Sequence, residues 1–304
     1  MTAASARDSH ERLAGLFVPI VTPFAADGAV ALDHFESNLR KWLDEPIDGF
    51  VLFGSNGEGA LLDTSEKEQL TARAQHVIAH EKPVVVGISA ESTRAGRAEA
   101  ERLGALGADY LLVSPPAYFG ASLSPAALLD HYHGIADAAP VPLIVYHIPK
   151  NTHVVIEPGL MAEIVRHPNV AGFKDSSGDI RRFGEYAVQC GTRCRRLIGN
   201  GSQLYAALEL GAAGAIIGIG QFAARPCAEI IEAQRAGDHA RAGRIQERLI
   251  PVHKEIVGAH GPIGTKAALD LIGYTGGPPR PPLRPLSAKE QQRVARVMHE
   301  AALT

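Results

Sequence analysis

Lys174 has the residue type and the position for covalent chemistry on a carbonyl group. It follows Val170–Phe173, a short apolar run that predicts a buried strand. A charged amine at the end of a buried strand is costly, and desolvation favours its neutral form. A neutral amine is a nucleophile that forms a Schiff base with a ketone. The simpler alternative is that Lys174 reaches solvent or pairs with Asp175.

Tyr146 is the candidate acid and base beside this lysine, because it lies near the end of the preceding predicted strand, 142–148. Schiff-base formation needs proton transfer at the carbinolamine oxygen, and carbon–carbon cleavage needs it at a hydroxyl oxygen. A tyrosine within hydrogen-bond reach can serve both steps. The alternative is a core tyrosine whose hydroxyl group has a protein partner.

The loop Gly54-Ser-Asn-Gly-Glu-Gly59 follows another predicted strand. Its hydroxyl group and backbone N–H groups suit a substrate carboxylate, and Glu58 is expected to hold the loop. The alternative is a simple turn without a binding role.

Eight apolar runs, each followed by a segment with helical spacing, organise these candidates. The predicted strands are 16–24, 49–54, 83–89, 110–116, 142–148, 170–175, 196–199 and 213–219. The predicted helices are 32–43, 64–80, 93–106, 124–138, 157–166, 180–189, 203–210 and 224–235. Such alternation predicts a parallel sheet covered by helices, and eight units predict an α/β fold of the (β/α)8 TIM-barrel type.

A doubly wound open sheet is the alternative architecture, although no Gly-x-Gly-x-x-Gly follows the first strand. Within the predicted helices, Ser124 is expected to cap one N-terminus, and Ser65 with Glu68 to form a capping box at another.

The predicted division of the chain is a catalytic barrel over 12–236 and a C-terminal helical extension over 237–304. The extension has helical patterns over 239–257, 263–271 and 287–302, with a proline-rich connector between the last two. In a barrel of this kind the active site lies at the carboxyl ends of the strands. Ser55, Tyr146 and Lys174 all lie at such ends.

Composition limits the classes of function. The 304 residues carry a net charge of −3, which gives no basic footprint for nucleic acid. No apolar run reaches membrane-spanning length, no signal peptide is evident, and the three cysteines form no metal or disulfide pattern. A cytoplasmic protein is expected. His76 and His80 share a helix face but have no third ligand at useful spacing, so no metal site is predicted.

Three segments at predicted strand ends occur together and in order: Gly54-Ser-Asn-Gly-Glu58, Tyr146-His-Ile-Pro149 and Gly172-Phe-Lys-Asp-Ser176. They resemble the signature segments of the dihydrodipicolinate synthase / N-acetylneuraminate lyase family of class I aldolases. The resemblance spans about 16–219. It implies an imine between Lys174 and the ketone of pyruvate or another 2-oxo acid, without a further cofactor.

The resemblance also implies roles for other residues. Tyr146 would be the acid and base, and Gly54, Ser55 and Asn56 would bind the 2-oxo acid carboxylate. Ile216 would line the imine pocket. The family further implies a homotetramer that is a dimer of dimers.

Tyr118 matches the tyrosine that some members lend to the proton relay of a neighbouring subunit. The match is looser because Ala117 replaces a tyrosine often found there.

Two departures bear on the substrate. Asn151 stands where dihydrodipicolinate synthases commonly have an arginine for the aldehyde carboxylate, and Ser55-Asn56 replaces their two threonines. Asn151 is then a candidate substrate-binding residue, and Lys150 either pairs with a distal acid group or is a solvated loop lysine. Both departures count against lysine biosynthesis, whereas Gly-Ser-Asn-Gly-Glu, Pro-x-Asn-Thr and Lys-Asp-Ser-x-Gly-Asp resemble 4-hydroxy-2-oxoglutarate aldolases more closely. The resemblance therefore favours an aldolase for a 4-hydroxy-2-oxo acid such as 4-hydroxy-2-oxoglutarate, yielding an aldehyde and pyruvate.

Three other readings stay open: 4-hydroxy-tetrahydrodipicolinate synthase, an aldolase or dehydratase for 2-keto-3-deoxy sugar acids, and a non-catalytic barrel that binds a 2-oxo acid.

Overall fold

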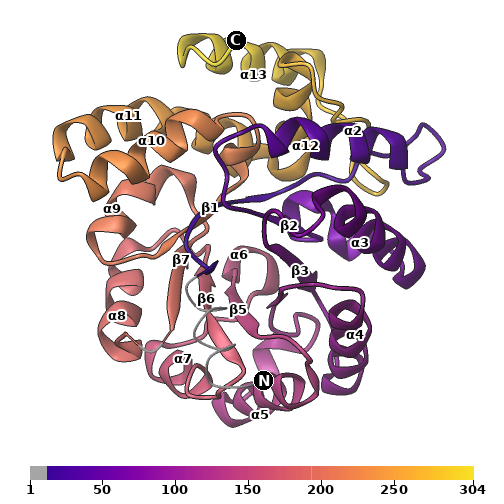
Figure 1. The fold of residues 1–304 in the computed structure, drawn as a ribbon, viewed down its shortest axis with the longest axis vertical. Coiled ribbons are helices and arrows are strands. Elements are labelled where there is room, and N and C mark those ends of the chain that lie inside the picture. Colours follow the sequence, from indigo (N-terminus) through magenta and orange to yellow (C-terminus); the bar gives the residue numbers. More distant parts are fainter. Residues whose placement is uncertain (1–11, 193) are drawn as a thin grey trace.

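The chain folds as a closed barrel of eight parallel strands surrounded by helices (Figure 1). The computed structural model describes residues 12–192 and 194–304. The strands are β1 Gly15–Pro19, β2 Gly49–Leu52, β3 Val84–Ile88, β4 Tyr110–Val113, β5 Leu143–His147, β6 Val170–Asp175, β7 Arg195–Ile198 and β8 Gly214–Ile216. Each strand pairs with the next in sequence order, and β8 pairs with β1. The predicted (β/α)8 TIM barrel is therefore confirmed, and the open sheet is excluded.

Helices connect successive strands and cover the outside of the barrel. They are α2 Leu32–Leu43, α3 Thr64–Ile78, α4 Thr93–Ala105, α5 Pro125–Ala138, α6 Pro149–Thr152, α7 Pro158–Ile164, α8 Ile180–Cys190, α9 Leu204–Glu209 and α10 Ala224–Arg235. After the barrel come α11 His239–Val252, the π-helix η6 His253–Gly258, α12 Ala259–Leu271 and α13 Ala288–Glu300. The division of the chain at residue 236 stays a prediction.

Two differences from the sequence expectations are local. Ser124 caps α5 as predicted, but the capping box of α3 is Asp63 with Glu66, so the predicted Ser65–Glu68 box is wrong. Asp63 accepts a hydrogen bond from the Glu66 N–H, and Glu66 accepts one from the Asp63 N–H. Several strands are also shorter than their apolar runs. At these strand ends the backbone stops pairing with the adjacent strand, although the side chains that follow are still buried.

Side chains divide between two apolar cores. One fills the barrel interior and contains Phe17, Val51, Tyr110, Ile144, Tyr146, Ala171, Leu197 and Ile216, among others. The larger one lies between the sheet and the helices, with Trp42, Tyr132, Phe173 and Tyr186 among its fully buried members. Alternate strand residues supply the two cores, as the pleat requires.

A register irregularity in β6 aims Lys174 into the barrel. Leu143 of β5 pairs with Val170, but the next residue, Ile144, pairs with Gly172. One extra residue in a strand reverses the inward–outward alternation beyond it. Ala171 accordingly packs inside, whereas Phe173 packs outside, which leaves the following residue, Lys174, facing inward.

The C-terminal helices lie beside α2 and α10, on the side of the molecule away from α5 and α7 (Figure 1). Helix α12 contacts the short 3-10 helix η1 Ser55–Gly57 at the end of β2. The segment after the barrel therefore reaches the carboxyl ends of the strands, where the site is expected.

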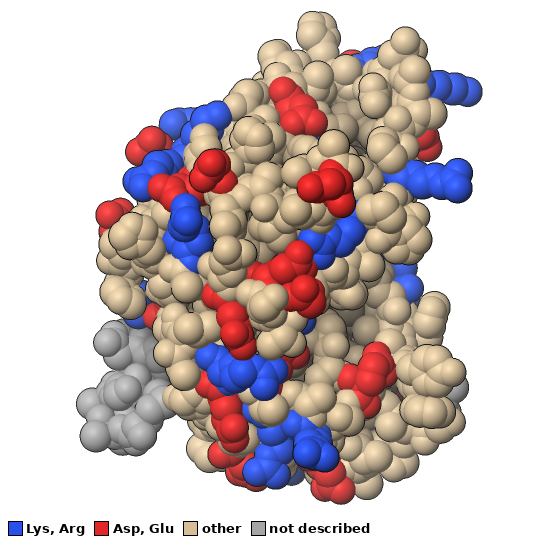
Figure 2. Space-filling view, turned by 90° about the vertical axis from the view of Figure 1, so that its right-hand side faces the viewer, with Lys and Arg blue, Asp and Glu red and all other residues tan. Residues whose placement is uncertain are grey.

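On the face in Figure 2, acidic and basic side chains are interspersed rather than gathered by sign. Lys67 pairs with Glu99 at 2.7 Å, and Arg73 pairs with Glu36 at 2.6 Å. No helix within 12–192 and 194–304 is long and apolar enough to cross a membrane.

Candidate active site

A cavity of about 840 Å³ opens at the carboxyl ends of the strands. Its lining divides into two sets of side chains. We call the set carried on or directly after strand ends and packed against the barrel interior the floor: Ser55, Tyr146, Lys174 and Ile216. We call the set from α6, the loop after β7 and the π-helix the rim: Lys150, Asn151, Asn200 and His253.

Lys174 and Tyr146 meet on the floor. They are directly opposite each other in the β5–β6 register. The Lys174 Nζ atom lies 4.1 Å from the centroid of the Tyr146 ring, and the two residues are 3% and 6% exposed. A Cβ atom at Gly199 would come within 3.0 Å of Lys174 Cε, so glycine leaves room for the lysine side chain. The sequence prediction that these two side chains lie together is confirmed.

Ser55 completes the polar part of the floor. Its Oγ lies 3.5 Å from the Tyr146 hydroxyl oxygen, at the long end of hydrogen-bond range. Ser55 opens η1, and Gly54 before it supplies no side-chain cap, so the first N–H groups of η1 have no side-chain acceptor there. The next residue, Asn56, is held by the C-terminal segment, because its Oδ1 accepts a hydrogen bond from Thr265 Oγ1 of α12 at 2.9 Å.

The loop that carries Ser55 is held in a strained backbone conformation. Phe53 and Glu58, on its two sides, have φ angles of 58° and 53°. Left-handed non-glycine residues persist only where surrounding contacts enforce them. Gly59 allows the tight return, since a Cβ atom there would lie 2.1 Å from the Phe53 carbonyl oxygen.

Glu58 fastens this loop to the C-terminal segment, as the sequence suggested it would hold the loop. Its carboxylate forms a 2.5 Å ion pair with Lys266 of α12, and both side chains are buried. Its second oxygen accepts a hydrogen bond from the Arg280 backbone N–H at 2.9 Å. Burial lowers the pKa of Lys266, and the Glu58 charge opposes that change. Glu58 is therefore an anchor and not a free acid of the cavity.

The rim is rich in hydrogen-bond donors. Lys150 donates to the Gly258 carbonyl oxygen at 2.9 Å, which ties α6 to the end of η6. The Asn200 Oδ1 atom accepts hydrogen bonds from the Ser202 N–H and hydroxyl groups. The Asn200 NH₂ group takes no part in these two bonds and can donate to a substrate. Ser176, two residues after Lys174, adds a hydroxyl group to the lining.

His253 is the most buried member of the rim. The imidazole is 9% exposed, and its Nδ1 atom has no hydrogen-bond partner among the described residues. Burial, helped by the positive charges of Lys150 and Lys254, lowers its pKa to about 4. At neutral pH it is an uncharged imidazole with one N–H donor.

Of the remaining predicted residues, Gly54, Asn56, Asn151 and Ile216 line the cavity, but Tyr118 does not. The Tyr118 side chain is 82% exposed and packs edge-on against Phe119. Its backbone is nevertheless fixed, because its N–H donates to the Glu91 carboxylate at 2.9 Å.

Sequence reasoning did not assign Ser176, Asn200 or His253. Ser176 could have been found, since residues two apart in a strand face the same side. Asn200 follows the end of β7 and belongs to none of the three signature segments. His253 belongs to no motif, and only the packing of η6 over the strand ends reveals it.

Within the described part of the chain, no group of three or more His, Cys, Asp or Glu side chains is arranged to hold a metal ion. The polar lining of the cavity comprises amines, hydroxyls, amides, an imidazole and the carboxylates of Glu58 and Glu91.

Comparison with known proteins agrees with this geometry. The sequence profile of the dihydrodipicolinate synthetase family matches residues 12–301. A 4-hydroxy-tetrahydrodipicolinate synthase from Exiguobacterium sp. is 30% identical over 286 residues, covering 94% of this chain and 97% of that protein. An uncharacterized DapA-like lyase from Halobacterium salinarum is 34% identical over 274 residues, covering 90% and 89%.

Solved structures show the same architecture. The dihydrodipicolinate synthase from Acinetobacter baumannii, complexed with pyruvate, superposes with a TM-score of 0.92 at 26% identity, covering 96% of this chain and all of that one. The Thermotoga maritima enzyme gives a TM-score of 0.91 at 27% identity, covering 96% and 99%. Members of this family are lyases that use a lysine–pyruvate imine and no external cofactor. The chain belongs to the dihydrodipicolinate synthetase family.

Proposed function

We propose that Lys174 forms an imine with the ketone of a 2-oxo acid and that Tyr146 moves the protons of the reaction. The observation that carries this proposal is the buried contact of the Lys174 amine with the Tyr146 ring, with the Ser55 hydroxyl beside the phenol. Gly54, Ser55 and Asn56 then bind the 2-oxo acid carboxylate, and Ile216 packs against the imine.

The Lys174 amine adds to the ketone carbon, and the carbinolamine oxygen leaves as water after protonation through Tyr146. Tyr146 then takes the proton of the substrate hydroxyl group, the carbon–carbon bond breaks, and an aldehyde departs. The electron pair remains as an enamine on Lys174, which is protonated on carbon and hydrolysed to pyruvate. In the reverse direction the same groups join pyruvate to an aldehyde.

The preferred substrate we propose is a 4-hydroxy-2-oxo acid with a second carboxylate, such as 4-hydroxy-2-oxoglutarate. The rim supports it, because Lys150 supplies positive charge and Asn200 and His253 supply neutral donors. Asn151 adds an amide where a synthase commonly has an arginine. Cleavage of this substrate would give pyruvate and glyoxylate.

The second candidate is 4-hydroxy-tetrahydrodipicolinate synthase. It is favoured by the names of relatives that are 30–33% identical over most of the chain. Its aldehyde substrate also carries a carboxylate, so the rim suits both reactions. Aldolases and dehydratases for 2-keto-3-deoxy sugar acids use the same imine and form a third group.

A direct substrate comparison separates these candidates. Purified protein is assayed for pyruvate release from 4-hydroxy-2-oxoglutarate and from a 2-keto-3-deoxy sugar acid, and for condensation of pyruvate with the synthase aldehyde. We expect the highest kcat/KM with 4-hydroxy-2-oxoglutarate, and a roughly tenfold loss in Lys150→Met from removal of one charge-assisted contact. A higher kcat/KM in the condensation would assign the synthase activity instead. Imine formation without turnover of any substrate would indicate a binding barrel.

We further propose a cytoplasmic homotetramer. The exposed Tyr118–Phe119 pair suits burial against a second subunit, from which Tyr118 would reach the neighbouring active site. Size-exclusion chromatography with light scattering on the wild type and Tyr118→Ala tests this assembly.

A further inference from the structure

A second pair of side chains lies directly behind Tyr146 and Lys174. His147 and Asp175 are the next residues in the same register, so the two pairs are consecutive rungs of the β5–β6 ladder. Because side chains alternate along a strand, the first pair faces the cavity and the second faces the outer core. Neither His147 nor Asp175 has a part in the proposed reaction.

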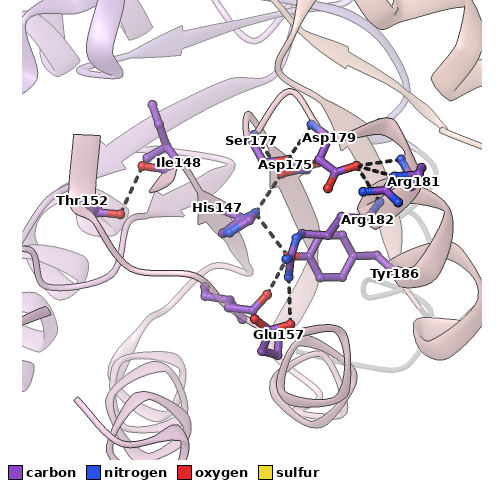
Figure 3. A network of polar contacts seen from close by, with 11 residues as sticks. His147, Ile148, Thr152, Glu157, Asp175, Ser177, Asp179, Arg181, Arg182 and Tyr186 are labelled. Atoms are coloured by element: carbon purple, nitrogen blue, oxygen red, sulfur yellow. Dashed lines mark hydrogen bonds and ion pairs between the residues drawn. The ribbon is translucent and has the colours of Figure 1, made fainter. Parts of the chain in front are cut away.

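His147 and Asp175 form a completely buried hydrogen bond. The His147 Nδ1 atom lies 2.8 Å from Asp175 Oδ1, and the two side chains are 0% and 1% exposed. The Tyr186 hydroxyl oxygen lies 3.2 Å from the same nitrogen and donates its own proton to the Ile156 carbonyl at 2.6 Å. Nδ1 thus faces two acceptors and carries the hydrogen. Figure 3 shows this network.

The bond is made where the two strands separate. Beyond it, the Ser176 N–H donates to the His147 carbonyl at 2.8 Å, and β5 then turns at Pro149 into α6. Proline has no N–H group to extend the ladder. The His147–Asp175 bond is therefore a side-chain tie across β5 and β6 at the last position before their paths diverge.

Asp175 also shapes the loop that follows the lysine. Its Oδ1 accepts from the Ser177 N–H and its Oδ2 from the Ser177 hydroxyl, each at 3.0 Å. This folds the chain back so that Ser176 and Ser177 border the cavity. One carboxylate consequently holds the strand end that carries Lys174, its neighbour that carries Tyr146, and a serine of the cavity wall.

Stability alone does not account for such a pair. Apolar side chains of similar volume pack at least as well as a buried polar pair, which must be desolvated. A hydrogen bond is directional, however, and fixes the relative position of the backbones that carry it. We propose that His147 and Asp175 are positioning residues that hold Tyr146 at its proton-transfer distance from the reacting atoms on Lys174.

The test compares rates per active site in variants that stay folded. His147→Leu leaves the Asp175 carboxylate buried and could fail to fold, so the double variant His147→Leu/Asp175→Asn removes the charge as well. Pyruvate is added, and borohydride is added after defined times to count trapped imine by mass spectrometry. This measurement rests on the proposed imine, and the wild-type reaction is its control: without a wild-type adduct the proposed function fails first.

We expect the double variant to trap imine to the full extent but about 10- to 100-fold more slowly, and to turn over more slowly by a similar factor, as misplacement of about an ångström typically produces. The pyruvate concentration for half-maximal trapping should not change. His147→Asn, which keeps a donor toward Asp175, should recover part of the rate.

His131 of α5, which does not line the cavity, offers a matched control. It is also buried, its Nδ1 is hydrogen-bonded to Thr93 at 3.0 Å, and its Nε2 has no partner among the described residues. His131→Leu should lower the melting temperature but leave the rate per trapped site unchanged. A wild-type rate in the double variant, or an equal rate loss in His131→Leu, would overturn the proposal.

Discussion

The floor and the rim of the cavity are built by different means. Floor residues such as Lys174 and Tyr146 come from strand ends, are almost completely buried and are fixed by the ladder beneath them. The rim is assembled from the helical turn after β5, the loop after β7 and the π-helix η6, and Lys150 and Asn151 are exposed. The floor therefore suits the bond-making chemistry, which needs fixed geometry. The rim suits substrate selection, because its residues can change without disturbing the barrel.

The strongest test of this division is removal of the nucleophile. Lys174→Ala should bring turnover below detection while leaving the far-ultraviolet circular dichroism spectrum and melting transition of a folded barrel. The physical reason is that no other amine lies on the floor. Turnover retained in this variant would mean that another residue is the nucleophile and that the floor is not the site of the chemistry.

The next largest effect is expected for the proton-transfer group. Tyr146→Phe keeps the ring packed against Lys174 but removes the hydroxyl group, so kcat should fall by about 10²–10⁴-fold. Ser55→Ala, which leaves the phenol in place, should cost less. Steady-state kinetics of both variants measure these losses. A near-normal rate in Tyr146→Phe would mean that Tyr146 only packs against the lysine and transfers no proton.

The ion pair that joins the C-terminal segment to the loop carrying Ser55 can be tested by measuring protein stability. Lys266→Met leaves the Glu58 carboxylate buried without its ion-pair partner, so the free energy of unfolding should fall by about 3–5 kcal/mol. Removing the exposed Arg241–Glu229 pair by Arg241→Ala is the control and should cost about 1 kcal/mol or less. Equal losses in urea unfolding would mean that the buried pair does not anchor the loop.

The smallest expected effect is a pH dependence that originates in the rim. The folded state holds the pKa of His253 at about 4, below the ordinary 6.5, so the unfolded chain takes up this proton first as pH falls. The free energy of unfolding should decrease by up to about 3 kcal/mol between pH 6.5 and 4 because of this group. His253→Gln should show a shallower decrease over that interval. Identical profiles for the two proteins would contradict a buried neutral imidazole.

These differences also explain what could be predicted from the sequence. The barrel and the floor follow from local patterns, because apolar runs mark the strands and the active site lies at their carboxyl ends. The β6 bulge that aims Lys174 inward leaves no mark in the sequence, since Ala171 and Phe173 are both apolar. His253 and Thr265 reach the site only through tertiary packing, which periodicity cannot reveal.

Imine trapping shows directly whether Lys174 bonds covalently to the ketone of a 2-oxo acid. The intact protein is treated with pyruvate and borohydride, with and without a metal chelator, and the modified residue is located by peptide mass spectrometry. We expect one stable pyruvate-sized adduct on Lys174 that is indifferent to the chelator and absent in Lys174→Ala. No adduct, together with activity that the chelator abolishes, would rule out the Lys174 imine and require a metal-dependent mechanism.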